Sequence, residues 1–374
     1  MEILKKLSDI VKNAKHFIFI IFYILMTIST SVNMIYPLHL IKQIKIMPKL
    51  MTKIINICLI KYQAAINANI IYMSKMNIWI YTNKKRELTN EILKGSTISM
   101  SNHLSELDVF YIGALFYKYY PHNKKFISFA KDNVRYYPFI GWMLLASDTI
   151  FVQNRNEKPN IKQHEYIENK LNCEDCDKNI LIFPEGTTYR KNVKDRREEE
   201  MQKRGAIIKY KNLLIPKTTG LYMIEKKIQK KMSIIMKIEG EKELEDYTMK
   251  NFFKGQCMEN IHIYYELLNQ EEKKEKLCSR EEFDNKIYKE YENIDKILDQ
   301  STIKWKKNYK YEKLTCSLKE IFWLCIHLFL GIYTPWILMI NNYYRIYFIS
   351  ASLFYIYIGY KEHNTIGQVN KRNE

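Results

Sequence analysis

Residues 95–110, "GSTISMSNHLSELDVF", place a short apolar run directly before a polar turn and the start of a second apolar segment. The run 95–100 is typical of a strand, and residues 104–120 are typical of a helix. His103 lies in the turn, and Asp108 lies one turn into the expected helix. Positions five apart on a regular helix diverge by about 140°, so the two side chains meet only if His103 lies outside the helix and folds back.

Two hypotheses explain this turn. Ser105 and Asp108 form a passable capping box, in which the two side chains satisfy free N–H groups of a first helical turn. Alternatively, Asp108 fixes the tautomer of His103, whose imidazole acts as a general base near neutral pH. Spacing alone favours the capping box. The hypotheses are compatible, because Ser105 can cap the helix that directs Asp108 toward His103.

Strand-like and helical segments alternate beyond this turn. Strand-like runs cover 124–130, 148–153, 179–186, 212–218, 232–240 and 259–267, and residues 191–211 are a second helical stretch. The alternation predicts an α/β fold, a sheet flanked by helices. A second motif, "LIFPEGTTY" at 181–189, ends a strand as the first one does. Ligands bind outside the carboxyl ends of strands in such sheets, so both motifs are candidates for one site.

Composition restricts the partners. The chain has 374 residues and a formal charge of +18, which indicates an anionic partner: nucleic acid, an acidic membrane face, or a phosphorylated or CoA-bearing substrate. Its seven cysteines argue against a disulfide framework. Cys173 and Cys176 form one CxxC, for which a polar loop is favoured over a zinc or redox site. We expect no metal.

Apolar segments lie at both ends of the chain. Residues 17–41 contain no charged side chain, and a tilted span, a re-entrant pair or a cleaved signal peptide are all open. Residues 321–340 and 346–360 flank a short polar turn and predict a membrane hairpin, with a pair of buried soluble helices as the alternative. A membrane hairpin is not typical of a nucleic-acid-binding protein, so we expect this protein to bind no nucleic acid.

Four sequence blocks together resemble the glycerolipid acyltransferases of the 1-acylglycerol-3-phosphate acyltransferase superfamily, in its eukaryotic endoplasmic-reticulum branch. The first block is an NHxxxxD motif and the third is an unbroken FPEGT. The matching residues are Asn102, His103 and Asp108; Lys131, Pro138, Gly141, Trp142 and Phe151; Phe183 to Thr187; and Pro216. The resemblance covers about residues 90–265.

The resemblance implies acyl transfer from acyl-CoA, as co-substrate, to a lysophospholipid hydroxyl, without a further cofactor. His103 would be the base and Asp108 would orient it. Substrate-binding positions would be Asn102, Glu185, Gly186, Thr187, Arg155 and Lys131. The implied acceptor is 1-acylglycerol 3-phosphate. Alternative acceptors are lysocardiolipin, lysophosphatidylinositol and glycerol 3-phosphate. The alternative to an enzyme is a catalytically silent membrane scaffold.

Two positions depart from the family pattern. Thr188 follows FPEGT where many members acting on lysophosphatidic acid have arginine, with Arg190 two residues further. In the second block Asn154 takes the place of the usual arginine, and Arg155 is displaced by one. A shift of one residue on a strand turns a side chain to the other face. Both departures therefore concern contacts with the acceptor phosphate and leave the residues of the acyl-transfer step unchanged.

The expected organisation has five parts: a membrane anchor region over 1–50, the acyltransferase α/β domain over 51–270, a charged helical connector over 271–320, the membrane hairpin over 321–360 and a polar tail over 361–374. The last four residues, "KRNE", resemble a di-basic retrieval signal. We expect a multi-pass endoplasmic-reticulum membrane protein whose catalytic domain faces the cytosol.

Overall fold

The computed structural model describes residues 2–73, 76–83, 95–119, 124–153, 161–171, 177–203, 205, 207–225, 230–239, 248, 251, 258–268 and 279–367. These residues belong to two compact units, each built from several stretches of chain. The first unit comprises Met1–Ile18, Ile70–Pro121 and Asp177–Thr315, and the second comprises Phe19–Asn69, His122–Cys176 and Cys316–Glu374.

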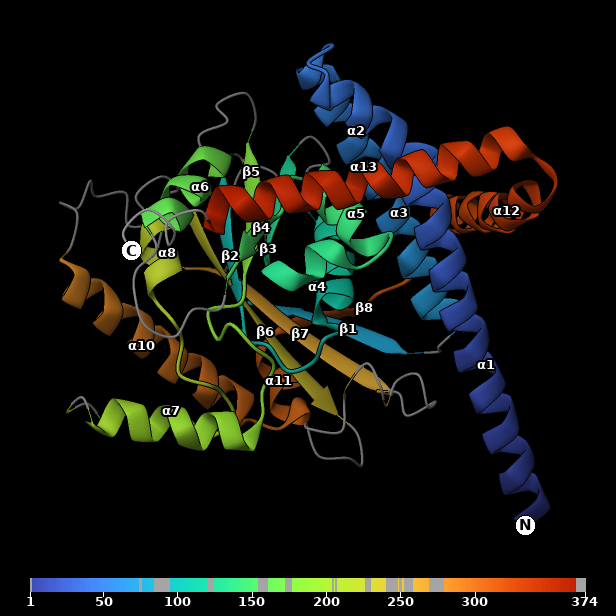
Figure 1. Ribbon diagram of the computed structural model, residues 1–374. Coiled ribbons are helices and arrows are strands. Elements are labelled where there is room, and N and C mark those ends of the chain that lie inside the picture. Colours follow the sequence, from blue (N-terminus) through green and yellow to red (C-terminus); the bar gives the residue numbers. More distant parts are fainter. Residues whose placement is uncertain are drawn as a thin grey trace. The chain divides into compact units, whose positions relative to one another are not determined.

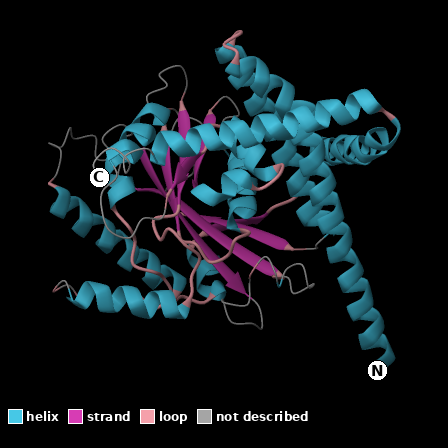
Figure 2. Cartoon of the chain, viewed as in Figure 1, coloured by secondary structure: helices cyan, strands magenta, loops and turns pink. Residues whose placement is uncertain are grey.

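A mixed sheet forms the centre of the first unit (Figure 2). Its strands are β1 (Asn77–Thr82), β2 (Thr97–Ser101), β5 (Lys178–Ile182), β6 (Lys230–Glu239), β7 (Asn260–Leu268) and β8 (Lys310–Lys313), in the order β5-β2-β6-β7-β1-β8. β2 runs parallel to both β5 and β6, and β1 runs parallel to β7. β6–β7 and β1–β8 are antiparallel. Every residue of β2 and β5 is buried.

Among its described residues this unit contains the helices α4 (Asp108–Tyr119), α7 (Lys191–Lys203), α8 (Thr219–Glu225), α10 (Arg280–Leu298) and α11 (Thr302–Asn308) (Figure 1), and residues 2–18 of a longer helix also belong to it. α10 begins with a capping box, since Ser279 accepts from the Glu282 N–H and Glu282 accepts from the Ser279 N–H. Its buried stripe, at helical spacing, consists of Phe283, Ile287, Tyr291, Ile294 and Leu298. The predicted α/β class is confirmed.

One predicted strand is wrong. Residues 212–218 are not part of the sheet, although 213–216 are buried. Pro216 has no N–H to donate to a ladder. The Ile215 carbonyl accepts instead from the Arg197 side chain, and the Lys217 N–H donates to the Pro184 carbonyl. The segment is therefore held by a side chain and a turn rather than by a neighbouring strand.

The second unit combines a short parallel pair, β3 (Lys125–Lys131) and β4 (Ile150–Val152), with helices. Its short helices are η1 (Thr30–Ile35), α2 (Tyr36–Gln43), η2 (Asp132–Tyr136), α5 (Ile140–Ala146) and α6 (Ile161–Leu171). Its long helices are α12 (Leu318–Ile340), α13 (Asn342–Gly367), most of α3 (Pro48–Met73) and the part of α1 (Glu2–Ser29) that follows Ile18. Trp142 of α5 stacks on Tyr355 of α13, with ring centroids 4.9 Å apart, so it packs in a core.

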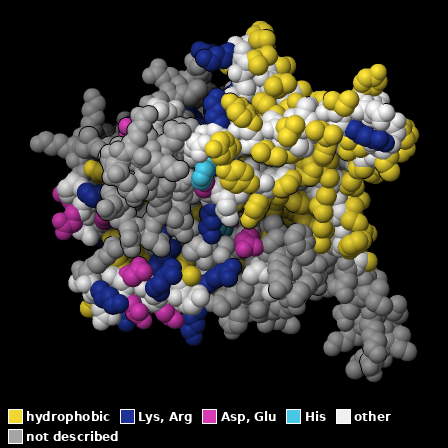
Figure 3. Space-filling model, in the orientation of Figure 1, with side chains coloured by type: hydrophobic (Ala, Val, Ile, Leu, Met, Phe, Trp, Pro, Cys, Tyr) yellow, Lys and Arg dark blue, Asp and Glu magenta, His cyan; other side chains and the backbone are white. Residues whose placement is uncertain are grey.

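Three helical stretches among the described residues are long and apolar enough to cross a membrane: Phe17–Gln43, Pro48–Tyr72 and Leu318–Ile340. The first and third correspond to the predicted N-terminal segment and to the first arm of the predicted hairpin. The second was not predicted, because lysines interrupt its apolar run. The second arm of the hairpin is helical as α13 but is not among the three. Hydrophobic side chains gather over α1, α12 and α13 in Figure 3.

Candidate active site

Asn102 anchors the end of β2. Its side-chain Nδ2 donates to the Met236 carbonyl at 3.0 Å, and its Oδ1 accepts from the Met236 N–H at 2.8 Å. The side chain thus continues the pairing of β2 with β6 by one step beyond the last strand residue. Because both polar atoms are used and the residue is buried, Asn102 fixes where the following residue begins rather than offering a free group to a ligand.

His103 and Asp108 meet because the turn between them folds back. His103 Nδ1 lies 3.0 Å from Asp108 Oδ2. The same oxygen accepts from the backbone N–H groups of Leu104 at 2.7 Å and Ser105 at 3.0 Å. Asp108 is the first residue of α4 and is fully buried. One carboxylate therefore closes the turn and orients the imidazole.

Ser105 supplies the other half of the cap. Its Oγ accepts from the Leu107 N–H at 3.2 Å, while its own N–H donates to Asp108. The capping and the catalytic hypotheses describe the same turn. The helix start directs Asp108 toward His103, because the carboxylate that caps the turn is also the one that contacts the imidazole.

The His103 ring is fixed on one face by Phe183, the first residue of FPEGT. The ring centroids are 4.2 Å apart and the planes differ by 23°. The His103 carbonyl accepts from the Tyr189 N–H at 2.7 Å, which holds the two motifs together. The His103 side chain keeps 17% of its surface exposed, whereas Asp108 keeps none. A substrate can therefore reach the imidazole but not the carboxylate behind it.

FPEGT forms a tight turn after β5. The Gly186 N–H donates to the Phe183 carbonyl at 2.8 Å, and Gly186 has φ +65°, a conformation that favours glycine. Glu185 is fully buried, and its Oε1 accepts from the His103 N–H at 3.4 Å. Glu185 Oε2 has no hydrogen-bond partner among the described residues. Gly186 is exposed and Thr187 is half-buried, so these two residues border the outside of the turn.

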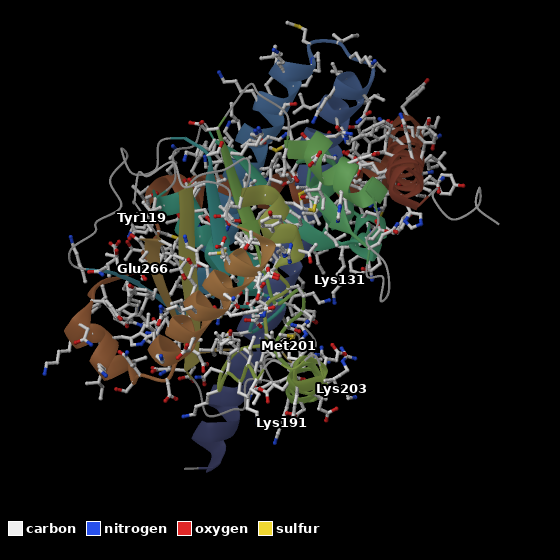
Figure 4. The ribbon with its side chains drawn as sticks, turned by 90° about the vertical axis from the view of Figure 1, so that its left-hand side faces the viewer. Tyr119, Lys131, Lys191, Met201, Lys203 and Glu266 are labelled. Atoms are coloured by element: carbon white, nitrogen blue, oxygen red, sulfur yellow. The ribbon has the colours of Figure 1, made fainter. Side chains whose placement is uncertain are left out.

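Arg197 is the structural residue that the sequence did not reveal. It lies in the charged run 195–200 of α7, a composition typical of a solvated helix face, yet Arg197 itself is buried. Its guanidinium donates to the Glu185 carbonyl at 2.7 Å and to the Ile215 carbonyl at 2.8 Å. Met201 and Lys203 lie further along α7, and Lys191 begins it (Figure 4). No residue in the run is apolar, so periodicity gave no signal for this position.

Burial governs the electrostatics of the site. It raises the pKa of the Asp108 carboxyl, against the hydrogen bonds from His103, Ser105 and Leu104. Burial raises the pKa of Glu185 well above its usual range, against the His103 N–H and the charge of Arg197. The same effect lowers the pKa of Arg197. The site thus holds two carboxyl groups that favour their neutral forms more than exposed carboxyls do.

The family comparison identifies this segment. A family model described as Acyltransferase matches residues 80–254. This segment is an acyltransferase domain. It contains the His103–Asp108 pair, FPEGT and Arg197, and the match confirms the predicted resemblance to glycerolipid acyltransferases.

Two relatives match parts of the chain. An uncharacterized acyltransferase of Schizosaccharomyces pombe is 30% identical over 92 residues, which cover 25% of this chain and 30% of that protein. Lysocardiolipin acyltransferase 1 of Danio rerio is 28% identical over 130 residues, which cover 34% of this chain and 32% of that protein. Each match spans about a third of the relative's length. No solved structure matches the chain.

Two further predicted site residues of the acyltransferase domain are Lys131 and Arg155. Lys131 is the exposed last residue of β3, in the second unit (Figure 4). Arg155 lies outside the described residues, as do Cys173, Cys176 and the C-terminal "KRNE". Gly141, from the same block as Lys131, approaches the backbone so closely that an added Cβ would lie 2.3 Å from the Arg135 carbonyl oxygen. The turn at Gly141 therefore requires glycine.

Proposed function

We propose that this protein transfers a fatty acyl group from acyl-CoA to the hydroxyl of 1-acylglycerol 3-phosphate, giving phosphatidic acid. The observation that carries the proposal is the contact of His103 Nδ1 with buried Asp108, on a ring that substrate can reach. A carboxylate at Nδ1 keeps the proton there, so Nε2 is the free basic nitrogen.

In this mechanism His103 Nε2 removes the proton of the acceptor hydroxyl as that oxygen attacks the thioester carbonyl. The new C–O bond forms, the C–S bond breaks, and the CoA thiolate leaves and takes the proton from His103. Asp108 stabilises the imidazolium between these steps. General-base catalysis of this kind contributes about 10²–10⁴-fold to the rate.

The other site residues would bind or position substrates. Glu185, Gly186 and Thr187 would shape the pocket for the polar head of the acceptor. Lys131 and Arg155 would contact phosphate groups of CoA or of the acceptor, for which cationic side chains are suited. Asn102 would place His103 through its bonds to Met236 rather than touch substrate.

The three apolar helices support a membrane protein. We propose the endoplasmic-reticulum membrane, with the catalytic residues on the cytosolic side, where acyl-CoA is available. A second acceptor deserves a test, because one relative carries the name lysocardiolipin acyltransferase. Both acceptors present a glycerol hydroxyl near a phosphate, so the same base would serve either.

The test is acyl transfer from labelled acyl-CoA to a panel of lysophospholipids that includes both acceptors. We expect H103A to lower the rate about 10²–10⁴-fold, while H164A, at a half-buried histidine of α6, keeps it. Product from one acceptor identifies the substrate. No product from any acceptor, beside a working acyltransferase control, would favour a silent membrane scaffold instead.

A further inference from the structure

A local concentration of positive charge precedes the membrane helix α12. Residues 302–313, which we name the α11–β8 segment, contain five lysines and one glutamate. All five lysines are exposed: Lys304, Lys306, Lys307, Lys310 and Lys313. The glutamate, Glu312, is paired with Lys118 of α4 at 2.7 Å. α10, the preceding helix, has six acidic and four basic residues, so the charge does not follow from the general lysine content.

Aromatic side chains accompany these lysines. β8 is the edge strand of the sheet, and Lys313 lies opposite Trp79 of β1. The Lys306 ammonium lies 4.8 Å from the centre of the Trp79 ring, and that of Lys313 lies 5.9 Å from it. Tyr311, two residues before Lys313, is 45% exposed. Tryptophan, tyrosine and lysine together are the side chains that concentrate at a membrane–water interface.

The chain keeps this segment near the bilayer. Only residues 314–317 separate Lys313 from Leu318, where α12 begins. Five steps of extended chain reach at most about 18 Å. Wherever α12 enters the membrane, Lys313 therefore stays within that distance of the entry point. Ionic attraction between a lysine and charged lipid acts over a Debye length of about 8 Å at physiological salt, and a tether this short allows Lys313 to approach the surface to that distance.

We propose that the α11–β8 segment docks on an anionic membrane surface beside the entry point of α12. Lysine clusters next to a membrane helix bind anionic lipid headgroups, and each lysine near such a surface adds a few-fold to binding. Lysines on an edge strand also prevent pairing with other strands. That role does not account for the exposed lysines of α11, nor for the Trp79 and Tyr311 rings beside them.

The test is lysine footprinting of the full chain in lipid nanodiscs, with an amine-acetylating reagent and mass spectrometry. Discs of phosphatidylcholine alone are compared with discs containing phosphatidylserine. We expect acetylation of the five lysines to fall about fivefold in the anionic discs and to recover in high salt. Lys289 and Lys296, exposed on acidic α10, are the internal controls and should not change.

A variant pair gives an independent readout. Ile303, on α11, is 79% exposed, and I303C provides a site for maleimide labelling mapped by mass spectrometry. Anionic discs should protect it, and protection should be lost when the five lysines are changed to glutamine. The proposal would be overturned if the α11–β8 lysines were acetylated equally in both kinds of disc. It would also be overturned if anionic discs protected the α10 control lysines as much as the α11–β8 lysines. The footprint does not depend on acyl transfer, so it stands or falls separately from the proposed activity.

Discussion

Asp108 and Asp148 are both withdrawn from water, and their surroundings move their pKa values in opposite directions. Burial raises the pKa of Asp108. Its partners, one imidazole and backbone N–H groups, lower the pKa by less than burial raises it. At Asp148 the ammonium groups of Lys42, Lys170 and Lys125 outweigh the effect of burial and hold the pKa below its usual range. Full positive charges compensate a desolvated carboxylate more strongly than dipoles do.

The geometry explains the difference. Asp148 Oδ2 lies 2.8 Å from the Lys42 ammonium and 2.6 Å from that of Lys125, so it joins α2 to β3 within the second unit. Lys170 of α6 lies 3.7 Å from Oδ1 and pairs with Glu362 of α13. This network ties helices and strand together. Asp108, by contrast, contacts a single titratable side chain, that of His103. This contact orients the imidazole, which is what a catalytic histidine base requires of its carboxylate.

D108N should give the largest loss of activity, about 10²–10⁴-fold. The amide cannot stabilise an imidazolium as a carboxylate does, and it can present its NH₂ group to His103, which selects the wrong tautomer. The measurement is the acyl-transfer rate per folded molecule, with D148N as the matched control. If D148N lowers that rate as much as D108N does, the distinction between the two aspartates fails.

D148N should instead destabilise the protein. It leaves the ammonium groups of Lys42 and Lys125 without their carboxylate in a largely buried site, while Lys170 keeps Glu362. Removing one partner of a buried pair costs about 3–5 kcal/mol. Thermal unfolding in detergent, followed by tryptophan fluorescence, measures the effect. The double variant K42Q/D148N should recover part of the loss, because one of the stranded cations is removed with its partner. Unchanged unfolding of D148N would show that water already solvates these lysines.

The sequence predicted the α/β class and the strand–turn–helix at residues 95–120 from short-range apolar patterns. It predicted the pairing of His103 with Asp108 from the four family motifs taken together, because the spacing of these two residues alone favours a capping box. It did not predict the Arg197 contacts or the Asp148 network, since both join residues far apart in the chain. It also placed a strand at 212–218, where apolar composition suggested pairing. The backbone partners of that segment include Arg197, Pro184 and Asp295, which no local pattern indicates.

R197M extends the comparison from carboxylates to a buried cation. The substitution leaves the Glu185 and Ile215 carbonyls without their donor, and each buried group left unpaired costs about 1–3 kcal/mol. We expect lower thermal stability and roughly a tenfold lower acyl-transfer rate, because displacement of catalytic groups by even small distances slows reactions. R196M is the control, since Arg196 is 67% exposed and pairs only with Glu200 among the described residues. Equal effects of the two substitutions would remove Arg197 from the positioning of the site.

E185Q should have the smallest effect and reports on protonation. The raised pKa of Glu185 means that the folded protein holds this proton more tightly than the unfolded chain does. Its stabilising contribution is therefore complete below the usual carboxyl pKa of 4.5 and is lost as the pH rises through the folded-state value. Glutamine is neutral at every pH, so wild type should lose stability relative to E185Q as the pH rises.

We expect a relative shift in Tm of about 2–4 °C, measured by unfolding scans from acidic to mildly basic pH. Parallel curves for the two proteins would mean that Glu185 is already ionised, with Arg197 compensating it as the lysines compensate Asp148.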